Sequence, residues 1–293
     1  MLDTDMGSDV DDALALAYCL KHPDIDLVAI TTVADDVVER AKIAWRILRA
    51  AKRTDIEIAP GIGWDAPIAG RRSWFGHEPK LLDGDEPTDF PLDGVNVLLE
   101  ATQPGDVEVA TIGMQSNVAA ALERDETFVD RVKRLNVMGG AFAPVRIGDM
   151  TIPPSYDHNL VVDPEASLRS LNAGMPTLYL GIDVTVHAPL LPSHVDELRS
   201  GDALCQEIAR QLDIWAPTSH MPDGVAAILH DPLLVSCIVE QRFVTSEIMS
   251  VTVAMHEGAV RTFIDPVEGQ PAEVITSVDG EAFANHFVEV IVS

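Results

Sequence analysis

The sequence predicts an α/β protein with an open, mainly parallel sheet flanked by helices. Short runs of β-branched and apolar residues recur along the chain, and stretches with helical periodicity separate them. These runs are almost continuously apolar, which is typical of parallel strands that are buried on both faces. Residues 249–255 alternate between apolar and polar side chains instead. This alternation adds a small antiparallel edge near the C-terminus to the prediction.

The predicted elements follow one another in alternating order. The expected strands are residues 27–33, 56–59, 107–112, 135–138 and 177–180. The expected helices are residues 13–20, 37–51, 96–101, 117–122 (capped by Asn117), 192–214 and 282–290. Asp163 followed by Pro164 predicts one more helix start, because an acidic cap and an early proline favour initiation.

Two stretches, 60–90 and 141–162, lack a period and are expected to be long irregular segments. Long loops in compact domains often bind ligands. No internal repeat or linker divides the 293 residues, so we expect residues 1–293 to form a single domain.

The chain is strongly acidic, with 47 Asp and Glu against 20 Lys and Arg and a formal charge of −27 at pH 7. Nucleic acid is therefore excluded as a partner, since its phosphates would be repelled. Most of the basic residues are Arg, and Lys is rare. Acidic, Lys-poor surfaces suit a cytoplasm of high salt, where ions screen the self-repulsion of the chain. A halophilic source is our hypothesis.

No apolar run reaches the ~18 residues that a membrane span requires, and no basic, apolar leader opens the chain. We therefore expect a cytoplasmic protein without a membrane partner. The three cysteines, Cys19, Cys205 and Cys237, lie scattered in apolar contexts. They are expected to be buried thiols, because neither a disulfide framework nor a zinc site has this spacing.

The first twelve residues carry five carboxylates, Asp3, Asp5, Asp9, Asp11 and Asp12, before an apolar helical run. Carboxylates this close raise one another's pKa unless a cation lies among them. Ligation by Asp oxygens alone suits a hard ion, Ca²⁺ or Mg²⁺. The plain alternative is an acid-rich loop at a helix N-terminus, where the dipole favours negative charge without any metal. An EF-hand is a poor match, because Gly7 stands where a ligand should be and no Glu closes the loop.

Polar residues also follow the other predicted strands. In a parallel α/β sheet, ligands bind at the carboxyl ends of the strands, so these residues are expected to converge on one rim. The residues concerned are Asp35 and Asp36, Ser116 and Asn117, Met138 before Gly139 and Gly140, Asp183, and the pair His230 and Asp231.

Six short motifs, taken together and in their order along the chain, are characteristic of one protein family. They are Asp3-Thr4-Asp5 with Asp11-Asp12-Ala13, the stretch Thr111 to Asn117, Val137 to Gly140, Asp157-His158-Asn159 with Asp163-Pro164-Glu165-Ala166, Asp183-Val184-Thr185, and His230-Asp231-Pro232. In these motifs and their order the chain resembles the inosine/uridine-preferring nucleoside hydrolase family, over residues 1 to about 235 and again in its C-terminal tail.

The resemblance implies a fold, a cofactor and a reaction. The fold is an open α/β structure with a mainly parallel sheet, and the cofactor is one tightly held Ca²⁺. The reaction is hydrolysis of the N-glycosidic bond of a ribonucleoside, which yields ribose and a free base. Family members are usually dimers or tetramers, so a homo-oligomer is expected.

The resemblance also assigns roles to residues. The implied Ca²⁺ ligands are Asp5, Asp12, the backbone carbonyl of Ser116, and Asp231. Asp5 would in addition be the general base that activates a metal-bound water, and His230 would face the leaving base. The implied ribose and substrate contacts are Asp11, Asp36, Met138, Asp157, Asn159 and, from the long loop, His77.

The chemistry agrees with these assignments, although each residue has a plainer role open to it. Carboxylates stabilise the oxocarbenium character that develops on the sugar, and an imidazole can donate a proton to the leaving base. On the other hand, Asp12 can be only a helix cap, and His230 only a packed histidine. Asp183 can hold residues that contact the ligand without touching the ligand itself, or it can only cap a strand end. Trp74 and Phe75 can stack on a base or anchor their loop.

The chain departs from the commonest family pattern in four places. Two added residues before Asp11 let Asp9 compete for a ligand role, and Asp35-Asp36 replaces the usual Gly-Asn. Met114 to Asn117 replaces Pro-Leu-Thr-Asn, and the first strand is nearly missing. Two other functions therefore stay open: hydrolysis of a different N-riboside, and Ca²⁺ and ribose binding without catalysis.

Overall fold

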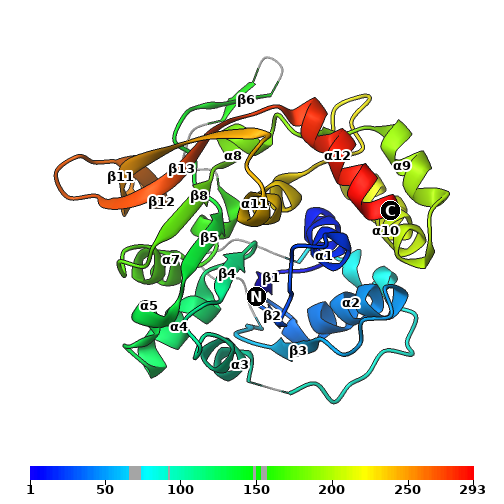
Figure 1. Ribbon diagram of the computed structural model, residues 1–293, viewed down its shortest axis with the longest axis horizontal. Helices are drawn as coiled ribbons and strands as arrows, with labels where there is room; N and C mark the ends of the chain where they lie inside the picture. Colours follow the sequence, from blue (N-terminus) through cyan, green and yellow to red (C-terminus); the bar gives the residue numbers. More distant parts are fainter. Residues whose placement is uncertain (66–73, 92, 148–149, 153–156) are drawn as a thin grey trace.

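The core of the molecule is a sheet to which both ends of the chain contribute strands (Figure 1). The computed structural model describes residues 1–65, 74–91, 93–147, 150–152 and 157–293. Within these residues, nine strands lie in the order β12-β11-β13-β8-β5-β4-β1-β2-β3. Their bounds are β1 Leu2–Thr4, β2 Ala29–Thr32, β3 Glu57–Pro60, β4 Glu108–Thr111, β5 Arg134–Met138, β8 Thr177–Leu180, β11 Val244–His256, β12 Ala259–Ile264 and β13 Gln270–Val278.

The pairing confirms the predicted fold class. Every neighbouring pair from β3 to β13 is parallel, whereas β11 pairs antiparallel with both β13 and β12. The antiparallel part therefore forms one edge of the sheet, as the alternation near the C-terminus predicted. Strand β1 is only three residues long, yet it lies between β2 and β4 and pairs with both. Asp5 thus leaves the sheet near its centre.

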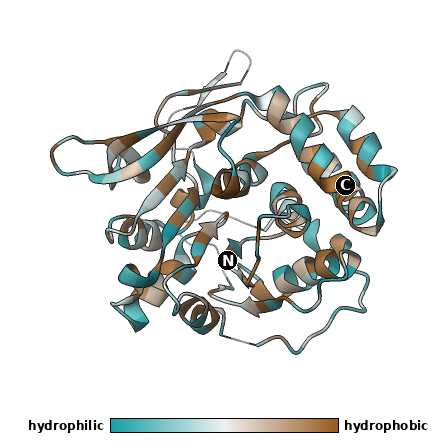
Figure 2. Cartoon of the chain, viewed as in Figure 1, coloured by the Kyte–Doolittle hydropathy of each residue, from teal (hydrophilic) through white to brown (hydrophobic). Residues whose placement is uncertain are grey.

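Helices cover both faces of the sheet. One layer consists of α1 Asp11–Lys21, α2 Val37–Ala50, α9 Pro192–Arg199, α10 Ala203–Trp215, α11 His230–Val239 and α12 Gly280–Val292, and the other of α3 Gly94–Ala101, α4 Ser116–Arg124 and α7 Pro164–Leu171. Successive residues of one strand join opposite cores: Ile30 packs with the first layer and Ala29 with the second. Because both faces are buried, apolar residues predominate on the inner strands, and the polar strand residues, such as Asp3 and Thr31, are buried with hydrogen-bond partners; Figure 2 shows the apolar residues in brown.

The two stretches expected to be irregular contain short elements. Residues 141–162 include a small antiparallel pair, β6 Val145–Ile147 with β7 Met150–Ile152, and the single turn α6 His158–Val161. Residues 60–90 include a 3₁₀ turn, Glu78–Leu81, while 66–73 lie outside the described residues. The prediction for 141–162 was wrong because strands of three residues are too short to establish a period.

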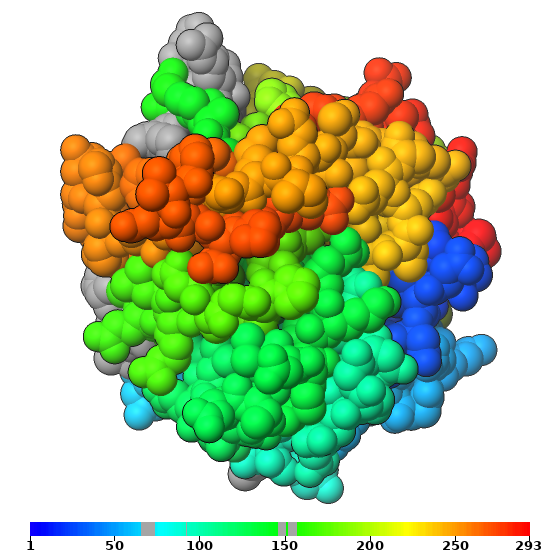
Figure 3. All heavy atoms as spheres, turned by 60° about the vertical axis from the view of Figure 1, so that its left-hand side comes forward, coloured from blue at the N-terminus to red at the C-terminus, as the bar shows by residue number. Residues whose placement is uncertain are grey.

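The remaining elements are short. They are α5 Phe128–Arg131, α8 Ile182–Thr185, a 3₁₀ turn Ala216–Thr218, and the two-residue strands β9 Pro189–Leu190 and β10 Ala227–Ile228. In the space-filling view of Figure 3, the long strands β11 and β12, in orange, form the upper surface of the face shown. All three cysteines are buried and free. No helix among the described residues has the length and apolar character to cross a membrane.

Candidate active site

A cavity of about 210 Å³ opens at the carboxyl ends of the central strands. It receives residues from the loop after β1, from α1, from the ends of β4 and β5, and from α6 and α11. The lining residues are Asp5, Ser8, Asp9, Asp11, Asp12, Phe75, Ile112, Met138, Asp157, His158, Asn159, Ile182, His230 and Asp231. The fold thus brings the acidic N-terminal segment together with residues more than 200 positions later in the chain.

Three carboxylates in this cavity come close enough to share a cation. Oxygens of Asp11, Asp12 and Asp231 all lie within 4.8 Å of one another. Asp11 and Asp12 belong to the first turn of α1 and Asp231 to the first turn of α11, and these two helices pack together. The side chains are buried, with 6%, 2% and 2% of the residue surface exposed. Two helix N-termini therefore direct acidic side chains at one buried point.

The electrostatics of this cluster favour a bound cation. Burial raises the pKa of Asp11, Asp12 and Asp231 well above the ordinary value, and their mutual repulsion raises it further. Burial likewise raises the pKa of Asp9 to about 6. A divalent ion would cancel this repulsion, and an all-oxygen donor set is the one that Ca²⁺ or Mg²⁺ prefers. The residues present therefore fit a hard cation.

Asp5 is held beside this cluster by a buried arginine. Arg40, from α2, is fully buried and its guanidinium donates to the backbone carbonyls of Asp5 and Met6, to the Ser8 hydroxyl, and to Ala34. Burial raises the pKa of Asp5, while the positive charge of Arg40 and then His158 oppose that rise. Arg40 thus fixes the loop that carries Asp5 and supplies the positive charge nearest to it.

Thr4 joins the first strand to the cluster. Its hydroxyl donates to Asp12 Oδ1 and accepts the N–H of Met6 at 3.1 Å. Asp3, on the same strand, has a comparable partner: the Thr31 hydroxyl donates to Asp3 Oδ1 at 2.6 Å, and Asn117 donates to it at 2.7 Å. Asp3 does not line the cavity. Successive residues of β1 therefore support opposite faces of the sheet.

The opposite wall of the cavity is formed around α6. The Asp157 carboxylate caps this turn by accepting the Leu160 N–H at 2.8 Å, and burial raises its pKa to about 7. The Asn159 amide nitrogen donates to the carbonyls of Ile112 and Met138, at 3.0 and 3.1 Å. The amide nitrogen is thereby committed to the ends of β4 and β5. The Asn159 amide oxygen is the atom left for a ligand hydroxyl.

Two imidazoles and one phenyl ring complete the cavity. His230 Nδ1 lies 2.5 Å from the Thr185 hydroxyl, and burial lowers the pKa of His230 to about 4. The ring is therefore neutral, with Nε2 as its second nitrogen. His158 lines the same cavity, 6.3 Å from Phe75 between ring centroids. The sequence motif contained His158, but we assigned it no role there.

The comparisons with known proteins agree with this geometry. The profile of the family described as inosine-uridine preferring nucleoside hydrolase matches residues 1–285. The chain belongs to this family. The pyrimidine-specific ribonucleoside hydrolase RihA of Salmonella typhimurium is 30% identical over 265 residues, which cover 84% of this chain and 81% of that protein. The chain is thus an enzyme of the ribonucleoside hydrolase family, as the motifs predicted.

Solved nucleoside hydrolases share the fold. A plant nucleoside hydrolase superposes with a TM-score of 0.85 at 24% identity, covering 100% of this chain and 98% of its own. A purine-preferring ribonucleoside hydrolase from Gardnerella vaginalis superposes with a TM-score of 0.81 at 23% identity, covering 99% and 96%. At these identities the likeness concerns the nucleoside hydrolase fold alone.

Three residues that the nucleoside hydrolase resemblance assigned lie outside the cavity. Asp36 is exposed, and its carboxylate caps α2 by accepting the Glu39 N–H at 3.0 Å. His77 is buried, with Nε2 2.9 Å from the Gly7 carbonyl oxygen and Nδ1 3.4 Å from the Thr218 hydroxyl. The Ser116 hydroxyl donates to Asp163 at 2.6 Å. The first two side chains serve as a helix cap and a loop anchor.

Other polar residues near the rim have scaffold roles in this nucleoside hydrolase. Asp183 accepts the backbone N–H groups of Phe142 and Ala143, at 3.2 and 3.1 Å, and so holds the segment after β5. The prediction that Asn117 caps its helix was wrong: the amide donates to Asp3 and Thr32 and accepts the Ile62 N–H. Trp74 stacks against Arg40, 5.2 Å from its guanidinium carbon, whereas Phe75 alone of the two aromatics reaches the cavity.

Arg40 is the supporting residue that sequence reasoning missed. A signal for it was present, because an arginine at position 40 falls on the apolar face of the predicted helix 37–51, in phase with Ile43 and Ile47. A charged side chain on such a face requires buried partners. The identity of those partners, the carbonyl groups of the loop after β1, depends on the packing of α2 against that loop.

Proposed function

We propose that this chain hydrolyses the N-glycosidic bond of ribonucleosides and that it requires Ca²⁺ to do so. The single observation that carries the proposal is the convergence of Asp5, Asp11, Asp12 and Asp231 on one buried cavity. These side chains come from two distant parts of the chain, and a cavity with a few convergent polar groups is the usual form of a small-molecule site.

The family resemblance alone supports the Ser116 carbonyl as a ligand of the ion, because Ser116 does not line the cavity. Asp5, Asp12 and Asp231 are the proposed side-chain ligands, and Asp11 lies beside them. Asp11, Asp12 and Asp231 support this role best, because their oxygens already lie within 4.8 Å of one another. When bound, Ca²⁺ would orient the vicinal hydroxyls of a ribose and lower the pKa of a neighbouring water.

Asp5 is the proposed general base. It follows β1 directly, it lines the cavity, and Arg40 binds the backbone carbonyls of Asp5 and of the next residue, Met6. A general base must be placed within hydrogen-bond reach of the proton that it removes, and a rigid loop reduces the cost of holding it there. Asp5 would take the proton from the attacking water, and the neighbouring carboxylates that stay ionised would stabilise the cationic sugar.

Asp157, Asn159 and Met138 are the proposed sugar contacts. Asp157 offers a carboxylate oxygen and Asn159 its amide oxygen, and both side chains are oriented by bonds to the backbone. Acceptors fixed in this way bind hydroxyl groups without a further ordering cost. The exposed position of Asp36 gives it no part in this wall, so we do not carry its ribose contact forward.

His230 is the proposed hydrogen-bond donor to the leaving base. If the Thr185 hydroxyl donates to Nδ1, the ring proton is on Nε2, and the neutral imidazole can donate a hydrogen bond from that atom to the base. His158 provides a second imidazole in the same cavity. Substituting each histidine separately by Gln, with single-turnover measurement of base release, would assign the donor between them.

The function is tested by a panel of ribonucleosides assayed for free base, with and without EDTA followed by added Ca²⁺. We expect release that EDTA abolishes and Ca²⁺ restores. Asp5→Asn should lower kcat by about 10³-fold, in the range that general acid–base catalysis contributes. The matched control is Asp36→Asn, because Asn is an equally good helix cap. Wild-type turnover in Asp5→Asn would refute the assigned base.

Inactivity toward every nucleoside, despite tight Ca²⁺ binding, would favour the non-catalytic alternative. A dimer or tetramer remains a prediction from the family resemblance, to be measured by light scattering. Base preference is also left to the panel, since the loop between β3 and α3 includes residues 66–73, which lie outside the described residues.

A further inference from the structure

A second cluster of ligand-type side chains lies at the far ends of the two helices that form the acidic cavity. Helix α1 begins at the cavity with Asp11 and ends at its C-cap, His22. Helix α11 begins there with His230 and ends at its C-cap, Glu240. At 1.5 Å per residue, each helix separates its two ends by about 15 Å. His286, from α12, is the third member of this distal cluster, which we define as His22, Glu240 and His286.

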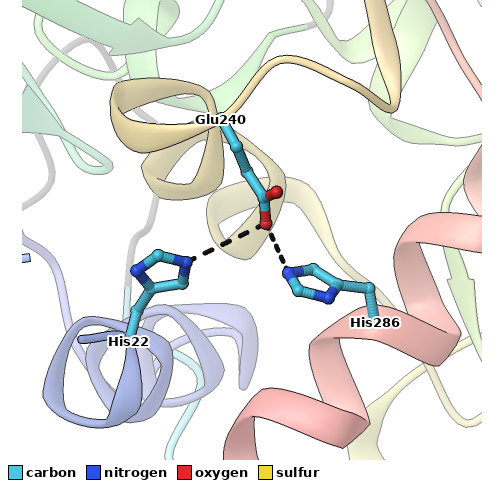
Figure 4. Close-up of side chains that lie close together, drawn as sticks. All are labelled: His22, Glu240 and His286. Atoms are coloured by element: carbon cyan, nitrogen blue, oxygen red, sulfur yellow. Dashed lines mark ion pairs between the residues drawn. The ribbon is translucent and has the colours of Figure 1, made fainter. Parts of the chain in front are cut away.

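The three side chains point toward one another from three different segments (Figure 4). His22 Nε2 lies 3.9 Å from Glu240 Oε1, and His286 Nε2 lies closer still to the same oxygen. All three ligand atoms lie within 4.8 Å of one another. The side chains are 9%, 21% and 14% exposed, so the cluster is largely enclosed but remains open to ions from solvent.

We propose that the distal cluster is a binding site for a divalent transition metal ion of the zinc class. Two imidazole nitrogens and one carboxylate oxygen are a donor set that suits Zn²⁺, Co²⁺ or Ni²⁺, with water as the fourth ligand. The all-oxygen set of the acidic cavity suits Ca²⁺ instead. The two sites would therefore select different ions by ligand type.

The surroundings favour positive charge at this point. Both α1 and α11 end here, and the C-terminus of a helix carries partial negative charge that stabilises a cation. The formal charge of −27 also raises the local concentration of divalent ions near the surface.

The ion would compete with hydrogen bonds that the three side chains of the distal cluster make. Glu240 Oε1 accepts the Tyr18 hydroxyl at 3.3 Å, and Arg242 binds Glu240 Oε2 at 2.9 Å. Arg242 also lies 3.0 Å from His286 Nδ1, and the Asp24 N–H donates to His22 Nδ1 at 3.2 Å. With both Nδ1 atoms accepting, the two Nε2 atoms carry the ring protons, and an ion must displace them.

One of these competing contacts, that of Arg242, is at the surface and can be released. The Arg242 side chain is 60% exposed, so it can turn into solvent. Glu289 Oε2 lies 4.0 Å from His286 Nδ1. When the ring proton is on Nδ1, this carboxylate can move closer and accept a hydrogen bond from it. A metal-bound imidazole usually donates its other N–H to a carboxylate in this way. Arg242 is thus a competitor of the ion, and Glu289 its supporting residue.

The test is titration of the full-length protein with Zn²⁺ by calorimetry, and with Co²⁺ by visible absorption, both in saturating Ca²⁺ to keep the acidic cavity filled. We expect one equivalent to bind and Zn²⁺ to raise the melting temperature. The double variant His22→Gln, His286→Asn should lose more than about 100-fold in affinity, since even outer partners of a metal site contribute 10–100-fold. Arg242→Ala should bind more tightly.

His256→Gln is the matched control, because His256 is an exposed histidine, 3.8 Å from Glu257, on strand β11. It should bind Zn²⁺ like the wild type. Absence of stoichiometric binding in the wild type would overturn the proposal, and so would equal binding by the double variant. If the double variant melts early, Glu240→Gln removes the anionic ligand while retaining its shape, and retention of Zn²⁺ affinity there would refute the site.

Discussion

The hydroxyl of Thr4 offers a test of the acidic cavity that leaves every carboxylate in place. Thr4 is fully buried and donates to Asp12 Oδ1. Thr4→Val keeps the shape of the side chain and removes this donor. If Asp12 binds Ca²⁺, the loss of a supporting partner should weaken Ca²⁺ binding about 10–100-fold. This corresponds to about 1.4–2.8 kcal/mol.

Thr31→Val is the control for this variant. Thr31 is also fully buried, and its hydroxyl also donates to a buried aspartate, Asp3, at 2.6 Å. Each substitution removes one buried hydrogen bond to a carboxyl group, and Thr4→Val also removes the acceptor of the Met6 N–H. Each should lower the free energy of unfolding by about 1–3 kcal/mol. Only Thr4→Val should weaken Ca²⁺ binding, because Asp3 does not line the cavity.

The assay is calorimetric titration of EDTA-treated protein with Ca²⁺, alongside urea unfolding of the same ion-free samples. The unfolding data separate the loss of stability, common to both variants, from the loss of affinity. Equal Ca²⁺ affinity in Thr4→Val and wild type would refute the role of Asp12 as a ligand. An equal loss of affinity in Thr31→Val would instead show that the effect is a general consequence of destabilising β1.

Three further predictions concern stability. Burial raises the pKa of Asp9 to about 6 and of Asp157 to about 7, so the folded, ion-free chain binds protons that the unfolded chain releases. Its free energy of unfolding should therefore fall as the pH rises from about 4 to about 7, and Ca²⁺ should raise the melting temperature more at pH 8 than at pH 5; an equal rise at both would contradict this. Gly280→Ala places a Cβ 1.7 Å from the His187 carbonyl oxygen and should cost about 3 kcal/mol in urea unfolding, whereas the exposed Glu281→Ala on the same turn should change stability little. Molar KCl should raise the melting temperature, because it screens a charge of −27; an unchanged melting temperature would count against the halophilic hypothesis.

Periodicity along the chain predicted most parallel strands of the sheet but not β1, whose three residues are too few to show a period. The longer parallel strands are buried on both faces, so they appear in the sequence as mostly apolar runs. The same reasoning put Asp5 at a strand end and Asp231 in a later segment. Because parallel strands end at one edge, the two were expected to meet, and both line the cavity.

Asp36 shows where this reasoning fails. It follows β2 by four residues, as a ligand at a strand end should. The backbone, however, turns at Ala34 and Asp35, with φ values of 73° and 47° in the left-handed region. This turn leads directly into α2, and the Asp36 carboxylate becomes the cap of that helix. A left-handed turn at two residues other than glycine has no reliable sequence signal.

The sequence by itself determined which residue types are present at the strand ends, because hydrophobic period and sheet direction are local properties of the chain. Only the tertiary structure decided which of them enter the cavity, and it added two sets of contacts whose partners no pattern specified. Arg40 reaches the loop of Asp5 from another helix, and α1 and α11 pair so that acidic residues meet at one end and His22, Glu240 and His286 at the other. The physical reason is that a buried charge is stabilised by partners distant in sequence, and packing alone selects those partners.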